Sequence, residues 1–190
     1  LFRSRKRLMN RELAQYLHGH VQNRLLATAI RMEQASSLSD PSVIIEELER
    51  VEELLDDASN NFARATNLSL ANEVRAVEGQ WQGLVDLEVK IDDAAERLIL
   101  QSALANDIGQ AVNELISNSI RHGFSSKIAI SLFMATPNKL IITSFDDGLG
   151  PRTGSPGLGS FLFDSLCGNN WSLSAAIGGG ALSRLEIGLV

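Results

Sequence analysis

The stretch from residue 112 to residue 123 constrains the fold of this chain more than any other stretch. Its apolar side chains recur at the spacing of one face of an amphipathic helix: Val112, Leu115, Ile116 and Ile120. A second stripe of polar side chains runs along the same helix: Glu114, Asn118, Arg121 and His122. The pattern predicts a helix that packs one face on a core, and Gly123 is expected to end it in a left-handed conformation.

This polar stripe has two interpretations. It is either a solvated helix face or a ligand site, since carboxylate and amide oxygens suit Mg²⁺ while a guanidinium and an imidazole suit phosphate. Two glycine-rich motifs downstream favour the ligand site. A predicted strand at 139–145 runs into residues 146–150 (Asp-Asp-Gly-Leu-Gly), and residues 156–159 (Pro-Gly-Leu-Gly) open another helical pattern. Glycines let a backbone approach a ligand closely, and a glycine-rich turn before a helix can bind an anion.

The three motifs, in this order, resemble the nucleotide-binding domain of the Bergerat-fold ATPases. That family includes gyrase, the heat-shock ninety chaperone and the sensor histidine kinases. The polar stripe looks like the family's N box, residues 146–150 match its first glycine box (Asp-x-Gly-x-Gly), and residues 157–159 resemble its second. The resemblance covers roughly residues 80–190 and implies that the chain uses ATP and Mg²⁺.

The resemblance also implies a role for each matching residue. Asn118 would ligate the Mg²⁺, and Asp146 would accept a hydrogen bond from the adenine amino group. The backbone would pass the purine at two glycines, Gly148 and Gly150. The phosphates would be held by the end of the polar stripe and by the second glycine box: Arg121, His122, Gly157 and Gly159.

Residues 8–67 are predicted to form an antiparallel helical hairpin. In its first helix, at 8–34, apolar residues recur every four positions, and residues 36–41 form a turn before the second helix. One hairpin is too thin to enclose a core. Two copies of the chain are therefore expected to close a four-helix bundle, which makes the protein a homodimer.

His18 lies at the edge of the apolar stripe of the first helix. Residues 11–25 resemble the phosphoacceptor box of sensor histidine kinases, nearest to the nitrate-sensor subfamily. The resemblance implies that His18 is phosphorylated and that Glu114 orients it or accepts its proton, while His20 is a bystander. The subfamily has an acidic residue that assists proton removal where this chain has Gly19, so slower phosphorylation is expected. It has a Gln that aids dephosphorylation of the partner where this chain has Asn23, so any phosphatase activity is expected to be affected.

The predicted fold class is α+β. A helical hairpin, forming a dimeric four-helix bundle, is followed by an α/β sandwich of the Bergerat type with its helices on one face of the sheet. The domains are placed at 1–77, for dimerisation and histidine phosphotransfer, and at 78–190, for ATP binding and catalysis, with a linker at 68–83. The second domain is expected to hold a helix at 102–122 and five strands, at 84–91, 127–133, 139–145, 171–177 and 182–188.

Composition and charge exclude some classes of function. The net charge of −6 argues against a general nucleic-acid binder, and no apolar run reaches the length of a membrane span. The single cysteine, Cys167, fits a reducing compartment and is expected to be a buried apolar side chain. The chain begins at Leu1 and is expected to be a cytoplasmic piece of a longer protein. The basic cluster at 3–7 is either a solvated helix end or a juxtamembrane segment of a parent anchored in the inner membrane.

The sequence thus predicts the core of a sensor histidine kinase of a two-component system. ATP would phosphorylate His18, and an aspartate on the receiver domain of a response regulator would then take the phosphoryl group. Two alternatives remain open: a serine kinase of the anti-sigma-factor type, and a non-catalytic dimeric scaffold that binds nucleotide weakly or not at all.

Overall fold

The computed structural model of the protein describes residues 22–38, 67–151 and 158–189. The chain divides into two compact units between Arg64 and Ala65. In the first unit, helix α2 (Gln22–Leu38) confirms the helix expected up to residue 34 and continues through the start of the expected turn. The rest of the predicted hairpin, including His18, Gly19 and His20, lies outside the described residues.

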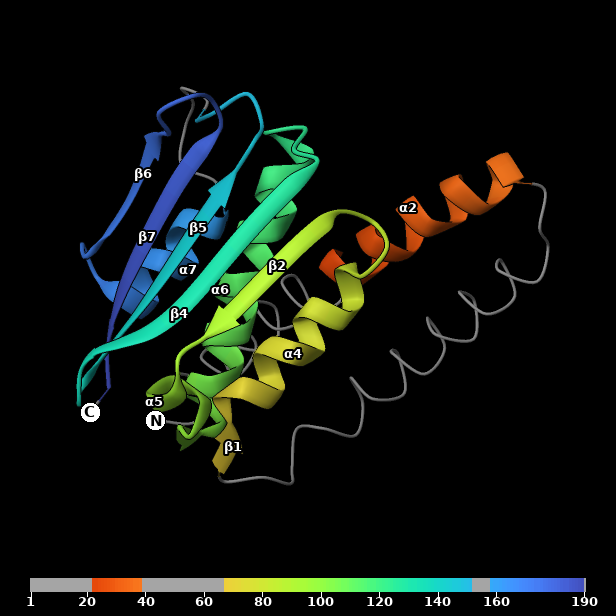
Figure 1. The fold of residues 1–190 in the computed structure, drawn as a ribbon. Helices are drawn as coiled ribbons and strands as arrows, with labels where there is room; N and C mark the ends of the chain where they lie inside the picture. Colours follow the sequence, from red (N-terminus) through yellow and green to blue (C-terminus); the bar gives the residue numbers. More distant parts are fainter. Residues whose placement is uncertain (1–21, 39–66, 152–157, 190) are drawn as a thin grey trace, which may run out of the picture. The chain divides into compact units, whose positions relative to one another are not determined.

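The second unit is built on a five-stranded sheet with the order β2-β4-β5-β7-β6 (Figure 1). Strands β2 and β4 run parallel, and every other neighbouring pair is antiparallel. The bounds of the strands are β2 Asp86–Ile91, β4 Lys127–Thr136, β5 Lys139–Asp146, β6 Trp171–Ala175 and β7 Ala181–Gly188. All five strands predicted from the sequence are confirmed, with ends that differ by up to three residues.

Three helices cover one face of this sheet: α4 (Leu70–Trp81), α6 (Ser102–Arg121) and α7 (Leu158–Cys167) (Figure 1). The strands bury the side chains on this face, since Ile130 lies opposite Ser144 and Leu132 lies opposite Ile142, and all four are buried. Asp146 lies opposite Ile128 on the same face, at the end of β5. The register therefore turns the Asp146 carboxylate toward the helices rather than toward the open face.

Helix α6 lies at the centre of this layer and confirms the helix predicted at 102–122. It contacts α4, α7 and β4. Its contact with α4 includes one buried polar bond, which the Trp81 indole nitrogen donates to Asn113 Oδ1 at 2.7 Å. At the other side of the layer, α7 packs on β6 through an edge-to-face contact between Phe163 and Trp171, whose ring centroids lie 5.4 Å apart. These contacts fix the two helices on either side of the polar stripe.

The interpretation of residues 68–83 as a linker is wrong. These residues contain α4, which begins after the N-cap Ser69, whose hydroxyl accepts from the Asn72 backbone nitrogen at 3.4 Å. Leu70, Val74 and Trp81 are fully buried and recur at helical spacing. Gly and Gln residues at 79–83 interrupt the apolar pattern at the end of this segment and are typical of a loop. The compact units divide at 64/65, so the whole of α4 belongs to the second unit, whereas the sequence suggested a division at 77/78.

Three short elements were not predicted. Strands β1 (Asn67–Ser69) and β3 (Ile99–Gln101) pair into a separate two-stranded antiparallel sheet, and α5 (Asp93–Glu96) follows β2. Each has four residues or fewer, which is too short to show a period in the sequence.

Cys167 is buried at the end of α7, as expected. Burial raises the pKa of its thiol to about 11, so the side chain stays neutral at physiological pH. None of the described helices has the length and apolar character needed to cross a membrane.

Candidate functional site

The first half of the polar stripe on α6 is held in a defined orientation. Asn118 Nδ2 donates to Glu114 Oε1 at 3.0 Å, one helical turn away, and both side chains are half-buried. Because a carboxylate only accepts, this bond fixes which end of the Asn118 amide faces Glu114. The Asn118 Oδ1 oxygen takes no part in this bond and remains an acceptor. Further along the stripe, Arg121 and His122 are exposed.

The start of α7 approaches this stripe closely. A Cβ built at Gly159 would collide with the carboxylate of Glu114, so only glycine leaves room for that side chain. Gly159 is buried and belongs to the first turn of α7. The structure thus brings Gly159 of the second glycine box beside Glu114 of the N box. Gly157 lies outside the described residues.

Asp146 lies at the end of β5 and is only 5% exposed. Its Oδ1 oxygen accepts two backbone N–H groups, from Gly148 at 2.9 Å and from Ala181 at 3.2 Å. Its Oδ2 oxygen lies 2.8 Å from the Ser119 hydroxyl oxygen of α6. One carboxylate is therefore fixed by three separate segments: the first glycine box, the start of β7 and the N-box helix.

The glycines around Asp146 are explained by contacts within the protein. A Cβ on Gly148 would collide with the carbonyl oxygen of Gly123, which also accepts from the Leu149 nitrogen at 2.8 Å. Gly150 has a φ of 82°, in the left-handed region that favours glycine. Gly180, in the turn between β6 and β7, also has a φ of 82°, and a Cβ there would collide with the Asp146 carbonyl oxygen. The turn can therefore close over the Asp146 backbone only because Gly180 has no side chain.

The expectation that Gly123 ends α6 in a left-handed conformation is wrong. The left-handed residue is its neighbour Phe124, with a φ of 53°. A Cβ on Gly123 would lie 2.5 Å from the Ser119 carbonyl oxygen and 2.7 Å from Ser125 Oγ. Gly123 is thus needed because the chain passes close to the last turn of the helix. A glycine in the sequence is compatible with both a left-handed backbone and such a close approach, so the residue type does not distinguish them.

Asp147, the next residue after Asp146, is exposed and faces a different set of donors. It accepts from the Ser126 nitrogen at 2.8 Å, from the Ser126 hydroxyl at 2.6 Å and from the Lys127 nitrogen at 2.9 Å. These hydrogen bonds, foremost the one from the Ser126 side chain, lower the pKa of Asp147. Asp147 thus anchors the start of β4, and the two adjacent aspartates have separate tasks.

The N box offers two side-chain oxygens to a divalent cation, which would need further ligands from water or from a substrate. Within the described part of the chain, there is no group of three or more His, Cys, Asp or Glu side chains that could form a metal site on its own. The oxygens of Glu114 and Asn118 form a smaller donor set. Such a set fits Mg²⁺, which keeps several waters and is commonly bound by one or two protein oxygens together with substrate phosphates.

Two contributors to the site were missed by sequence reasoning. Ser119 follows Asn118 in the helix, and its spacing from the other polar residues of the stripe does not distinguish it. Ala181 acts through its backbone nitrogen, which leaves no trace in the residue type. The sequence signal that could have indicated the second is the run of three glycines at 178–180, directly before Ala181.

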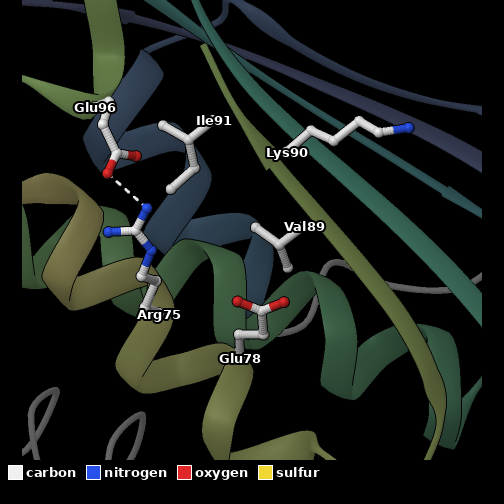
Figure 2. Close-up of a pocket in the computed structure, with 6 residues that line it drawn as sticks. All are labelled: Arg75, Glu78, Val89, Lys90, Ile91 and Glu96. Carbon is white, nitrogen blue, oxygen red and sulfur yellow. Dashed lines mark hydrogen bonds and ion pairs between the residues drawn. The ribbon is translucent and has the colours of Figure 1, made fainter. Parts of the chain in front are cut away.

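A cavity of about 300 Å³ lies elsewhere in the second unit, between α4, β2 and α5 (Figure 2). Arg75 and Glu78 come from α4, and across this space Arg75 donates to Glu96 at 2.5 Å. Lys90 points away from these three side chains (Figure 2). Both positive and negative side chains line the cavity, and the Arg75 guanidinium already forms an ion pair with Glu96. This cavity shares no residue with the Asp146 and Glu114 groups, and we interpret it as a groove bridged by an ion pair.

Comparison with solved structures identifies similar folds. The structure resembles the histidine kinase domain of the blue-light activated histidine kinase of Erythrobacter litoralis EL346, with a TM-score of 0.52, 21% identity, and coverage of 98% of this chain and 94% of that one. It also resembles the catalytic domain of the histidine kinase ThkA, with a TM-score of 0.51, 16% identity, and coverage of 66% and 96%. The ATP binding domain of PrrB from Mycobacterium tuberculosis gives a TM-score of 0.50, 21% identity, and coverage of 65% and 96%.

No protein-family model matches the sequence, and no curated protein sequence matches it. The structural neighbours share the fold of this chain at identities of 16–21%. The mixed sheet with helices on one face is therefore the fold of histidine kinase catalytic domains, as the three motifs predicted.

Proposed function

We propose that this chain is the core of a sensor histidine kinase, which uses ATP to phosphorylate its own His18. The observation that carries the proposal is the meeting of three motifs that lie far apart in the sequence. Ser119 of the N-box helix contacts Asp146 of the first glycine box, and Gly159 of the second glycine box contacts Glu114. Similarity of fold to histidine kinase catalytic domains supports the same assignment.

In this proposal, the two ends of the site bind the two ends of ATP. Asp146 accepts a hydrogen bond from the adenine amino group, since its buried carboxylate faces the helix layer at the glycine-rich loop. Asn118 offers its Oδ1 oxygen to Mg²⁺, which would neutralise charge on the phosphates. The phosphates would lie toward the start of α7, because the N-terminus of a helix attracts anions. As the sequence resemblance implies, Gly157, Gly159, Arg121 and His122 would hold them.

The transfer step forms a bond between a nitrogen of His18 and the γ-phosphorus, and breaks the bond from that phosphorus to the β,γ-bridging oxygen. ADP is the leaving group. Imidazole is largely neutral near pH 7 and does not need a strong base to become a nucleophile. The proton that the imidazole loses when it attacks phosphorus passes to a carboxylate, for which Glu114 is the candidate, because Gly19 replaces the acidic neighbour found in related kinases. Phosphoryl transfer of this kind rests mainly on positioning and charge stabilisation.

Further parts of the proposal follow from the sequence resemblance. The phosphoryl group of His18 passes to an aspartate on the receiver domain of a response regulator. The chain forms a homodimer through residues 8–67, and the nearest subfamily is that of the nitrate sensors. A parent protein anchored in the inner membrane would place the basic cluster at residues 3–7 beside anionic lipid.

Titration of the full chain with ATP, with and without Mg²⁺, tests the nucleotide site. The proposal predicts saturable binding that Mg²⁺ strengthens. A chain that binds no ATP under either condition would be a scaffold instead of a kinase. Phospho-amino-acid analysis then separates the two kinase classes, because phosphohistidine is acid-labile and phosphoserine is acid-stable.

A further inference from the structure

The Asp146 carboxylate has an unusual number of protein donors for a group that reads a ligand. An ionised carboxylate offers two lone pairs on each oxygen, four in all. Gly148 and Ala181 use both lone pairs of Oδ1 through their backbone nitrogens, at 2.9 and 3.2 Å. The Ser119 hydroxyl lies 2.8 Å from Oδ2. If that hydroxyl donates to Oδ2, a single lone pair of the carboxylate remains for a ligand.

The Ser119 hydroxyl has two acceptors within reach and only one hydrogen. Besides Asp146 Oδ2, the backbone oxygen of Leu115 lies 3.0 Å from Ser119 Oγ. A hydrogen bond to an ionised oxygen is roughly twice as strong as one to a neutral carbonyl. Without a hydrogen between them, two oxygens at 2.8 Å would also repel each other through their lone pairs. The hydrogen therefore lies between Ser119 and Asp146.

The number of free lone pairs decides which base the carboxylate can bind. Adenine presents one exocyclic amino donor beside a ring nitrogen that accepts. Guanine presents two donors side by side, a ring N–H and an exocyclic amino group, which suit a carboxylate with free lone pairs. A carboxylate with one free lone pair satisfies the single donor of adenine. It leaves one donor of guanine without a partner, and an unpaired buried polar group is costly.

We propose that Ser119 is a specificity-determining residue, which limits the base reading of Asp146 to a ligand with a single N–H donor. This inference rests on the proposed function, in which Asp146 faces the base of ATP. Ser119 acts by occupying one lone pair of Oδ2, while the backbone donors from Gly148 and Ala181 keep Oδ1 saturated. The discrimination between adenine and guanine is thus built into the link between the N-box helix and the first glycine box.

The helix supplies a matched control. Ser117 is also a serine of α6, is also buried, and has no hydrogen-bond partner for its hydroxyl among the described residues. Ser117→Ala makes the same chemical change as Ser119→Ala two residues away, without touching Asp146. A third variant, Ser119→Cys, keeps a side chain of similar size with a much weaker donor. Alanine favours the helix at either position, so these variants are expected to fold.

The test is calorimetric titration of the full chain and its three variants with ATP and with GTP, each in the presence of Mg²⁺, after thermal melts have shown that the proteins are folded. The wild type and Ser117→Ala are expected to prefer ATP to the same degree. In Ser119→Ala the preference for ATP over GTP is expected to fall about tenfold, the effect of one hydrogen bond, mainly through tighter GTP binding. Ser119→Cys is expected to give an intermediate ratio.

Two results would overturn the inference while leaving the proposed function intact. If the wild type binds ATP while Ser119→Ala keeps the full preference, Ser119 does not determine specificity. If Ser119→Ala weakens ATP and GTP equally, its role is structural only. A wild type that binds neither nucleotide would contradict the proposed function itself, and the role of Ser119 with it.

Discussion

The two ends of the candidate site are built in opposite ways. At the end proposed to bind the base, Asp146 is almost fully buried and accepts hydrogen bonds from three segments of the protein. At the end proposed to bind the phosphates, Glu114 and Asn118 are half-buried and share one hydrogen bond, and Arg121 and His122 are exposed. The protein itself thus holds the Asp146 carboxylate in place and leaves it one free lone pair, whereas the other end leaves oxygens and charges for groups that would come with the ligand.

This difference predicts which property each end controls. A buried carboxylate with three of its four lone pairs already used limits which ligand fits, so changes at the proposed base end should alter nucleotide affinity and selectivity. An open group completes its contacts only with the phosphates and the cation, so changes at the phosphate end should alter the transfer step more than binding. The following substitutions test this division.

The largest effect is expected for Asn118→Ala. The change removes the oxygen proposed to bind Mg²⁺, and loss of one group that stabilises developing charge commonly costs about a hundredfold or more in rate. The initial rate of phosphate incorporation from labelled ATP measures this effect. Asn138→Ala, in the exposed turn between β4 and β5, is the matched control and should leave the rate unchanged. Wild-type activity in Asn118→Ala would remove the side chain from the phosphate end.

A smaller effect, on binding, is expected for Asp146→Asn. The amide oxygen can still accept from Gly148 and Ala181, and the amide nitrogen can donate to Ser119 Oγ, so the fold should survive. The remaining amide N–H then meets the adenine amino group donor to donor. ATP affinity is expected to fall at least tenfold, as for the loss of a hydrogen bond to a charged group of about 1.5–3 kcal/mol. Calorimetry measures the affinity and circular dichroism the fold. Unchanged affinity would exclude Asp146 from the site.

Substitution of the neighbouring carboxylate, Asp147→Asn, should have the smallest effect and should change stability instead of binding. Asp147 accepts three hydrogen bonds at the start of β4, and these lower its pKa below the usual 3.8. Because the folded-state pKa is lowered, the stabilisation is fully present above the unfolded-state pKa and is lost as the pH falls through the folded-state pKa. The melting temperature of Asp147→Asn should therefore lie a few degrees below that of the wild type near pH 7, and the gap should close in strong acid. Weaker ATP binding in this variant would contradict the separate tasks of the two aspartates.

The contrast between the two aspartates also shows what the sequence can predict. The motif Asp-x-Gly-x-Gly singled out Asp146 as the reader of the base, and the register of β5 places it on the helix-facing side. Nothing in the residue types shows that Asp147 binds the backbone twenty-odd residues earlier, because its partners are two main-chain nitrogens and one serine. Contacts through the backbone depend on how the chain is folded rather than on which side chains it carries.

Long helices and strands were predictable because their side chains, unlike backbone contacts, leave a periodic pattern in the sequence. Helix α6 and the central strands repeat apolar residues over enough positions to show a helical or an alternating period. Helix α4 was missed because its end is rich in Gly and Gln, although its buried face keeps the period. The role of Gly123 was misassigned because glycine marks both a left-handed residue and a close approach, and only the structure separates them.

The most direct test of the central claim is whether the labelled phosphate that the chain takes from ATP is bound through an acid-labile or an acid-stable bond. The full chain is incubated with labelled ATP and Mg²⁺ beside His18→Gln and, as a matched control on the same predicted helix, His20→Gln. A histidine kinase core predicts acid-labile label on the wild type and on His20→Gln, and none on His18→Gln. Acid-stable label, or label that persists in His18→Gln, would contradict phosphorylation of His18.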